Sequence, residues 1–316
     1  MKLSEIYQLA IDLAKENDPR GVETVEKQLK KAQEKFAALK EEEKVDFDQE
    51  TLNNPYSDTR ILYGAPDREI KRVLVGIDIE VGEVLLADRL REKGQGIDLI
   101  IAHHPEGKAL AALHHVMHMQ EDILHELGVP INIAEGIMAS RISEVQRGLM
   151  PINHNKAVDV AKLLDIPMMC VHTPTDNLVT TYLQKIIDEE KPETLDDIIK
   201  ILKKIPEYAQ ATKDYSGPHI FVGAKDRRAG KVFVDMTGGT GGSEDAYAKL
   251  AQAGVGTLVG MHIGEKHRKE AEKAHVNVLI AGHISSDSLG MNLFLDKLVE
   301  RGVEVVSCSG MIRVER

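Results

Sequence analysis

Apolar positions in the first 45 residues recur at intervals of three and four, the spacing of amphipathic helices. One such segment covers residues 3–14, and a second covers residues 22–39 after a break at residues 18–21. In the second segment the apolar side chains form a narrow seam of the coiled-coil kind. Two interpretations stay open: a hairpin that binds a partner or another copy of the chain, and a helical pair that lies against its own domain.

From residue 71 onwards, apolar strand-like runs alternate with helical segments. The predicted strands cover residues 73–78, 97–102, 168–171, 219–222, 231–235, 257–260, 276–280 and 303–307. Helices are predicted over residues 81–93, much of 108–165, 177–189, 195–204 and 244–253. This alternation predicts an α/β fold with a mostly parallel sheet covered by helices.

Four of the predicted strands are followed within three residues by a histidine. These histidines are the pair His103 and His104, then His172, His262 and His283. Ligands of α/β proteins bind at the carboxyl ends of buried strands, so these imidazoles are expected to face one crevice. An aspartate follows four residues after two of them, Asp176 and Asp287. Because neutral imidazole and carboxylate together suit Zn, Fe or Mn, the pattern predicts a metal site.

Each of these motifs also has a purely structural interpretation. Neighbouring residues on a strand point to opposite faces, but at a strand end before Pro105 the adjacent His103 and His104 can diverge towards two neighbouring metals. They could equally cap the strand. The segment from His172 to Asp176 is expected on a loop, where it is also a good turn sequence.

Asp287 is expected in the first turn of a helix that begins near Ser285, with His283 at the strand end. An aspartate there also stabilises a helix start through the helix dipole, which explains Asp287 but not His283.

Two further patterns each allow two interpretations. Four histidines, His114, His115, His118 and His125, lie on one predicted helix, where they form either a metal site or a solvated face. The glycine-rich loop 238–242 lies between a strand and a helix. Its backbone N–H groups could hold an anion or phosphate, or the glycines could serve a tight turn that needs positive φ.

The composition of the 316 residues narrows the possible partners. With 42 % hydrophobic and 29 % charged residues, the chain resembles an ordinary globular protein. Its formal charge of −11, dispersed basic residues and lack of tryptophan argue against nucleic acid as a partner. No apolar run approaches the ~20 residues of a membrane span, and the start lacks a signal-peptide core, so a cytoplasmic protein is expected. The two cysteines, Cys170 and Cys308, are expected to be free.

Over residues 70–316 these motifs, in this order, resemble the Nif3-like family of dinuclear metal proteins, also labelled GTP cyclohydrolase 1 type 2 homologues. The matching blocks are residues 73–78, 98–105, 172–176, 238–242 and 281–283 with an acid four residues later. Two divalent ions per chain (Zn, Fe or Mn) are implied, and so is a toroidal hexamer. The implied ligands are His103, His104, Asp176, His283 and Asp287, with His172 beside them. Asp287 stands where the family usually has the longer Glu, which predicts looser or water-mediated coordination.

The resemblance also implies two α/β domains with the metal site between them at the strand ends. We expect an N-terminal helical extension over 1–62, a first α/β domain formed by 63–178 with 278–316, and a second α/β domain over 179–277.

The function expected from these features is a metal-dependent hydrolase that acts on a small substrate, such as a nucleotide-like molecule or a cyclic amide, through a metal-activated water. Candidates for proton transfer are His172, His262 and Glu265, which all lie at or just past strand ends. The alternative is a non-enzymatic metal-binding scaffold or regulatory protein that acts through oligomeric assembly.

Overall fold

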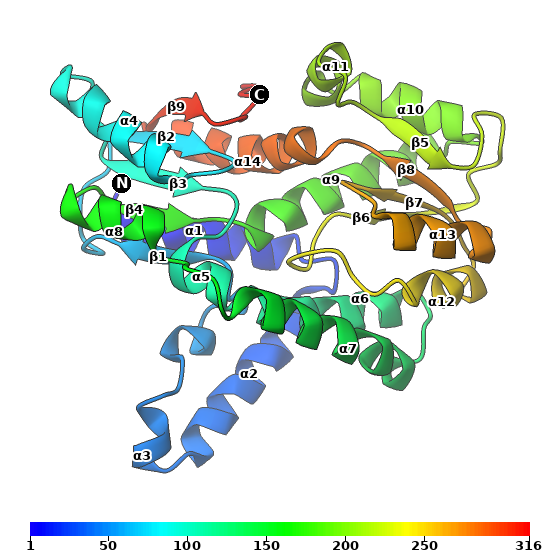
Figure 1. The fold of residues 1–316 in the computed structure, drawn as a ribbon, viewed down its shortest axis with the longest axis horizontal. Coiled ribbons are helices and arrows are strands. Elements are labelled where there is room, and N and C mark those ends of the chain that lie inside the picture. Colours follow the sequence, from blue (N-terminus) through cyan, green and yellow to red (C-terminus); the bar gives the residue numbers. More distant parts are fainter.

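The computed structural model describes all 316 residues, and its strands form two separate sheets (Figure 1). The strand order is β1-β4-β3-β2-β9 in the first sheet and β5-β8-β7-β6 in the second. The first sheet contains β1 (Arg60–Tyr63), β2 (Arg72–Gly76), β3 (Leu99–Ala102), β4 (Met168–Cys170) and β9 (Glu304–Cys308). The second contains β5 (His219–Val222), β6 (Lys231–Asp235), β7 (Val255–Gly260) and β8 (Asn277–Ile280). The predicted α/β class is confirmed.

The second sheet repeats the plan of the first. Strands β2, β3 and β4 are parallel and carry the antiparallel edge strand β1 beside β4. Strands β6, β7 and β8 are likewise parallel and carry the antiparallel β5 beside β8. Strand β8 therefore belongs to the second sheet, whereas the expected boundary between residues 277 and 278 assigns nearly all of it to the first domain. After β8, only strand β9 belongs to the first sheet, where it pairs with β2.

Two long helices, α9 (Thr173–Glu190) and α14 (His283–Val299), lie between the sheets (Figure 1). Each packs on both cores: Leu178 and Met291 belong to the core of the first sheet, and Val179 and Leu289 to the core of the second. Helix α9 follows a strand of the first sheet and α14 follows a strand of the second. Their first turns therefore meet where the carboxyl ends of the two sheets face each other.

Other helices cover the outer faces of the sheets. The first sheet is covered by α4 (Val81–Glu92) and α8 (Lys156–Leu163), with α5 (Gly107–Ala111) between them. One face of the second sheet packs on α10 (Leu195–Lys203) and α11 (Pro206–Lys213). The other packs on the 3-10 helix η2 (Leu113–His118), α6 (Met119–Glu126), α7 (Ile131–Leu149), α12 (Ala246–Gln252) and α13 (Glu265–Ala274). No helix combines the length and apolar composition that a membrane crossing requires.

The N-terminal region divides into a packed helix and a projecting arm. Helix α1 (Leu3–Glu16) buries Leu3, Ile6 and Ala10 in the core of the first sheet, so it is not an extension outside the domain. The arm, formed by α2 (Val22–Ala38), α3 (Glu41–Lys44) and the 3-10 helix η1 (Gln49–Leu52), projects from the body (Figure 1). The seam residue Phe36 packs on Phe47 of the same arm, with ring centroids 5.0 Å apart. This packing favours the interpretation in which the apolar seam is covered by its own chain.

Candidate metal centre

The two His-x-x-x-Asp motifs both lie on helix starts. His172 is the N-cap residue of α9, and Asp176 lies in the first turn. His283 is the first residue of α14, and Asp287 follows one turn later. In a helix, residues four apart lie on the same face, so each motif presents its histidine and its aspartate together. The expected loop at residues 172–176 and the expected helix start near residue 285 are therefore corrected: both helices begin directly after their strands.

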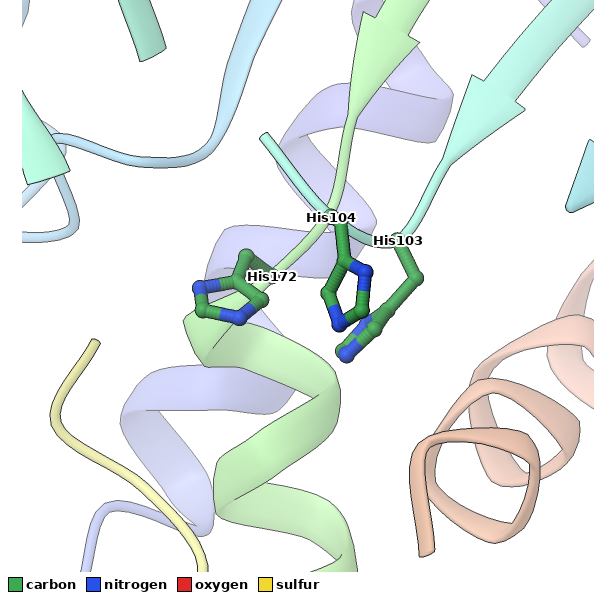
Figure 2. A group of neighbouring side chains, drawn as sticks. All are labelled: His103, His104 and His172. Atoms are coloured by element: carbon green, nitrogen blue, oxygen red, sulfur yellow. The ribbon is translucent and has the colours of Figure 1, made fainter. Parts of the chain in front are cut away.

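The structure brings the side chains of these motifs together with His103 and His104 from the end of β3. Figure 2 shows the rings of His103, His104 and His172 converging. His103 Nε2 lies 3.4 Å from Asp287 Oδ1 and 3.6 Å from Asp176 Oδ1. His104 Nε2 and His283 Nε2 lie 3.5 and 3.6 Å from Asp287 Oδ2. The two oxygens of Asp287 thus face different histidines.

The centre of this cluster is polar, buried and without hydrogen bonds. His103 and Asp287 are each 1 % exposed, and Asp176 is 4 % exposed. His103 Nε2, Asp176 Oδ1 and both carboxylate oxygens of Asp287 make no hydrogen bond. A buried polar atom without a partner costs about 1–3 kcal/mol, so four of them in one place indicate a missing ligand. The donor set fits a divalent metal, because three overlapping groups of three ligand atoms each lie within 4.8 Å of one another.

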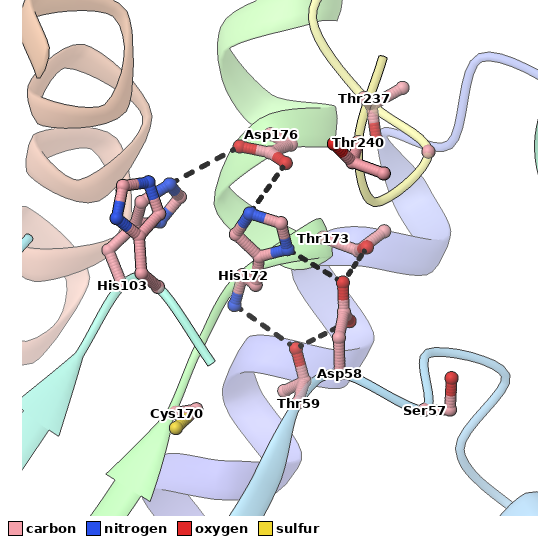
Figure 3. A network of polar contacts seen from close by, with 12 residues as sticks. Ser57, Asp58, Thr59, His103, Cys170, His172, Thr173, Asp176, Thr237 and Thr240 are labelled. Atoms are coloured by element: carbon pink, nitrogen blue, oxygen red, sulfur yellow. Dashed lines mark hydrogen bonds and ion pairs between the residues drawn. The ribbon is translucent and has the colours of Figure 1, made fainter. Parts of the chain in front are cut away.

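Three of the histidines are oriented through their other ring nitrogen. His104 Nδ1 lies 2.7 Å from Asp78 Oδ1, and His172 Nδ1 lies 2.8 Å from Asp58 Oδ2 (Figure 3). A carboxylate only accepts hydrogen bonds, so each Nδ1 donates its hydrogen and Nε2 is the ring atom directed at the cluster. His103 Nδ1 similarly faces Thr175 Oγ1 at 3.0 Å. Carboxylate–histidine pairs of this kind are typical of metal sites.

Asp58 is a site residue that the sequence analysis missed. It is fully buried, and its Oδ2 also accepts a 2.7 Å hydrogen bond from Thr173 Oγ1 (Figure 3). It precedes the antiparallel strand β1, so the beginning of β1 lies beside the end of β4. No strand was predicted at residues 60–63, and nothing local connects Asp58 with His172. Asp78 was missed as a site residue too, although it follows β2 at the same sheet edge as His103 and this position could have indicated it.

The protonation of the cluster follows its surroundings. Burial lowers the pKa of His103 to about 4, which leaves the ring neutral at physiological pH. Burial alone would raise the pKa of Asp287, but the three histidines around it outweigh this effect and hold its pKa well below the usual range. Burial opposes the charged form of His172, yet Asp176 and Asp58 raise its pKa to about 9. The cluster thus contains the neutral imidazole of His103, the carboxylate of Asp287 and a proton on His172 that a bound metal can displace.

A cavity of about 770 Å³ lies beside the cluster and is lined by His104, His172 and His283, among others. His262, at the end of β7, also lines this cavity, and its ring centroid lies 5.2 Å from that of His283. Desolvation and then His283 lower the pKa of His262. The volume is that of a small-molecule site.

Two predicted features do not join the cluster. Glu265 begins α13, does not line the cavity, and forms salt bridges of 2.8 Å with Arg268 and 3.5 Å with Lys269. Its carboxylate is thus held by cations on its own helix and not by the histidines. The histidines of the 114–125 segment also stay apart from the cluster: His114 stacks on His115 at 4.0 Å, and His118 pairs with Glu121.

A close approach of α9 and α14 brings the two motifs within reach. A Cβ atom placed on Gly290 would lie 2.2 Å from the carbonyl oxygen of Thr175. Only glycine allows the helices to pack at this distance. Thr175 neighbours Asp176, and Gly290 lies one turn after Asp287, so this contact sets the separation of the two aspartates.

The fold is similar to that of two solved structures. A NIF3 superfamily protein from Sphaerobacter thermophilus aligns with a TM-score of 0.76 and 26 % identity over 98 % of each chain. Reduced HcgD from Methanocaldococcus jannaschii aligns with a TM-score of 0.50 and 17 % identity, over 77 % of this chain and 85 % of that one, and shares the fold alone. No family model and no curated protein matches the sequence. The nearly full-length agreement with the first structure supports a Nif3-like family for this chain.

Proposed function

We propose that the cluster binds two divalent metal ions. One observation carries this proposal: the histidine nitrogens in the cluster lie 3.4–3.6 Å from the aspartate oxygens. Two ligand atoms bound to one ion at about 2.0–2.2 Å with tetrahedral angles are roughly 3.3–3.6 Å apart. The side chains are thus already spaced as ligands, at a distance too long for good hydrogen bonds.

The proposed ligands divide into two groups that share Asp287. His103, Asp176 and Asp287 form one group of close ligand atoms, and His104, His283 and Asp287 form another. Asp287 would therefore bridge the two ions, one with each oxygen, and Asp176 would bind the first. His172, 3.6 Å from Asp176 Oδ2, lies beside the first group. Nitrogen and oxygen ligands without thiolate suit Zn, Fe or Mn.

The chemistry we propose is hydrolysis of a small substrate, such as a nucleotide-like molecule or a cyclic amide. When bound, two adjacent ions would lower the pKa of a water and stabilise charge that develops on an attacked carbonyl, phosphoryl or ring carbon. The cavity holds the substrate against His104 and His283. His262 lines the same cavity and is the proposed proton-transfer residue, whereas the salt-bridged Glu265 is not.

The rival proposal, a non-enzymatic scaffold that acts through assembly, rests on the projecting arm. Val45, at the end of α3, is 82 % exposed there. A hexamer and a cytoplasmic location stay predictions.

Replacing His103 by alanine tests the proposal directly. Because His103 Nε2 faces both aspartates, the His103→Ala variant should lose most of its bound metal and its turnover. Metal content is measured by elemental analysis of freshly purified protein, where two equivalents per chain are expected for the unmodified protein. Turnover is measured with a metal-loaded panel of phosphoesters, nucleotides and cyclic amides.

The matched control is His118→Ala, which removes a half-exposed histidine from the predicted histidine-rich helix. It should retain both metals and full turnover. Turnover that survives His103→Ala unchanged would rule out the hydrolase and favour the scaffold. Fewer than one metal per chain in the unmodified protein would rule out the dinuclear centre.

Metal affinity should fall as the pH falls. Asp176 and Asp58 hold the pKa of His172 at about 9, against the effect of burial, so this ring is protonated at neutral pH before metal binds. Each proton that the metal displaces makes the apparent affinity about tenfold weaker per pH unit of acidification. Calorimetric titration with Mn²⁺ at three pH values between 6 and 8 measures this slope. An affinity independent of pH would show that the metal displaces no proton from His172, which would then lie beside the ligands without binding.

A further inference from the structure

The glycine loop, residues 237–242, forms the cavity wall next to the cluster. It joins β6 to α12, and Thr237 Oγ1 donates a 2.6 Å hydrogen bond to Asn177, the residue after Asp176. Thr240 of this loop and Asp176, both labelled in Figure 3, line the same cavity. A group bound to the glycine loop would therefore lie within the same cavity as the proposed metals.

Four of the six carbonyl oxygens of the glycine loop are held by side chains from other elements. Gln120 Nε2 donates to the carbonyls of Gly238 and Thr240, at 2.7 Å each. Arg141 Nε donates to Gly241 at 2.9 Å, and His267 Nε2 lies 3.0 Å from the carbonyl of Gly242. These hydrogen bonds restrain the loop independently of any ligand.

The N–H groups of the same loop have no such partners. Those of Gly239, Gly241 and Gly242 donate to no acceptor in the protein, although all three residues line the cavity. Gly239 has a φ of +86°, and Gly238 before it has a φ of +98°. The N–H of Thr240 donates to the carbonyl of Gly238, so these free N–H groups are that of Gly239 and the adjacent pair of Gly241 and Gly242. Free N–H groups in such a turn form an anion-binding concavity. The two interpretations of this loop from the sequence, a turn that needs glycine and an anion site, are thus compatible with each other.

Positive charge lies beside these N–H groups. Arg141 lines the cavity, and after its bonds to Gly241 and Glu144 its Nη2 has no partner. A planar guanidinium with a free N–H suits a phosphate oxygen. Asp235, one of the four carboxylates that line the cavity, is suited to accept an N–H or O–H of the same ligand.

We propose that the glycine loop and Arg141 bind the phosphate group of the substrate, while the reacting atom of the substrate reaches the His/Asp cluster. This inference rests on the proposed function and narrows its substrate to a phosphate-bearing small molecule. The cavity volume of about 770 Å³ is sufficient for a ligand of nucleotide size.

The test measures the affinity of the full-length protein for inorganic phosphate by calorimetry, in two variants. Gly241→Ala adds a methyl group that would meet only the edge of the His262 ring, at 3.4 Å, so the variant should fold normally while it obstructs the loop. Arg141→Gln removes the charge. Each change is expected to weaken phosphate binding about tenfold or more, because hydrogen bonds to a charged group are lost. Arg141→Lys should recover part of the affinity.

Matched controls come from α7. Gly136→Ala adds a methyl group where nothing lies within 4 Å, and Arg147→Gln removes an exposed arginine; neither residue lines the cavity. Both should bind phosphate as the unmodified protein does. Equal phosphate affinity in all variants would overturn the proposal. It would also be overturned if Asp287→Ala lost phosphate binding while Gly241→Ala kept it, because the His/Asp cluster alone would then hold the anion. Elemental analysis of the same samples tests the metal centre separately, so a failure of either proposal is recognised without the other.

Discussion

The Asp287→Ala variant is expected to lose both metal ions, and Asp287 is the single residue with the largest expected effect on the site. One of its oxygens faces His103, and the other faces His104 and His283. Removing the carboxylate takes one ligand from each ion at once and leaves three buried or half-buried rings without a counter-charge. Loss of groups that merely orient a ligand already costs 10–100-fold in metal affinity, so a loss beyond about a hundredfold is expected here. Elemental analysis and calorimetric titration with Mn²⁺ measure it.

The matched control is Asp296→Ala on the same helix. Asp296 pairs with Arg313 at 2.7 Å and has no part in the cluster. This variant should bind two metals with unchanged affinity, even where the lost ion pair lowers its melting temperature. Retention of one tightly bound metal by Asp287→Ala would show that Asp287 does not bridge the ions.

The Asp287→Glu variant distinguishes two interpretations of Asp287: an acid of the right length to bind the metal directly, and an acid that is too short and coordinates loosely. Because the Asp287 oxygens already lie 3.4–3.6 Å from the histidine nitrogens, an extra methylene has no gap to fill. Asp287→Glu should therefore weaken metal binding relative to the unmodified protein, though less than Asp287→Ala. Tighter binding by Asp287→Glu would support the expectation from the family resemblance, that a shorter acid coordinates loosely. Equal metal affinity of the unmodified protein, Asp287→Glu and Asp287→Ala would show that Asp287 stabilises the start of its helix and does not bind metal.

The second large effect is expected from Gly290→Ala, which adds one methyl group remote from any metal ligand atom. The added Cβ would lie 2.2 Å from the Thr175 carbonyl oxygen, a distance at which backbone must move. Overpacking of this kind typically costs about 1–3 kcal/mol of stability. Because Thr175 and Gly290 lie next to the two aspartate motifs, the movement should also separate Asp176 from Asp287. Metal affinity should fall together with the free energy of unfolding.

The control for Gly290→Ala is Gly136→Ala in α7, where a Cβ meets nothing within 4 Å. Alanine is favoured over glycine in a helix by about 1 kcal/mol, so this variant should be as stable as the unmodified protein or more so. Denaturant unfolding and metal titration are carried out on both. A Gly290→Ala protein that is destabilised but binds metal normally would show that the close helix contact serves packing alone.

Local patterns in the sequence were sufficient for most of the elements. Continuous apolar runs predicted buried strands, and β5 and β6 have the predicted bounds. Helical spacing predicted α4 and α10 to within one residue, because the period of side-chain burial is a local property. The histidines at 103, 104, 172 and 283 were expected at strand ends because they follow those runs directly, and the structure places them there. Their role as metal ligands stays a proposal.

What the sequence by itself determined is therefore the α/β class and the placing of imidazoles at the ends of strands. Only the tertiary structure decided which of these side chains meet. Asp58 reaches His172 across 114 positions of the chain, through an edge strand that begins with the charged Arg60 and is only partly buried after it, so it has no continuous apolar run. Glu265 follows β7 as His262 does, yet its salt bridge with Arg268, one turn along the same helix, holds its carboxylate away from the cluster. Asp287 faces His103 because Gly290 lets two helices from different sheets pack closely. Such contacts depend on the distance and angle between elements remote in the chain, and no local spacing of residues encodes them.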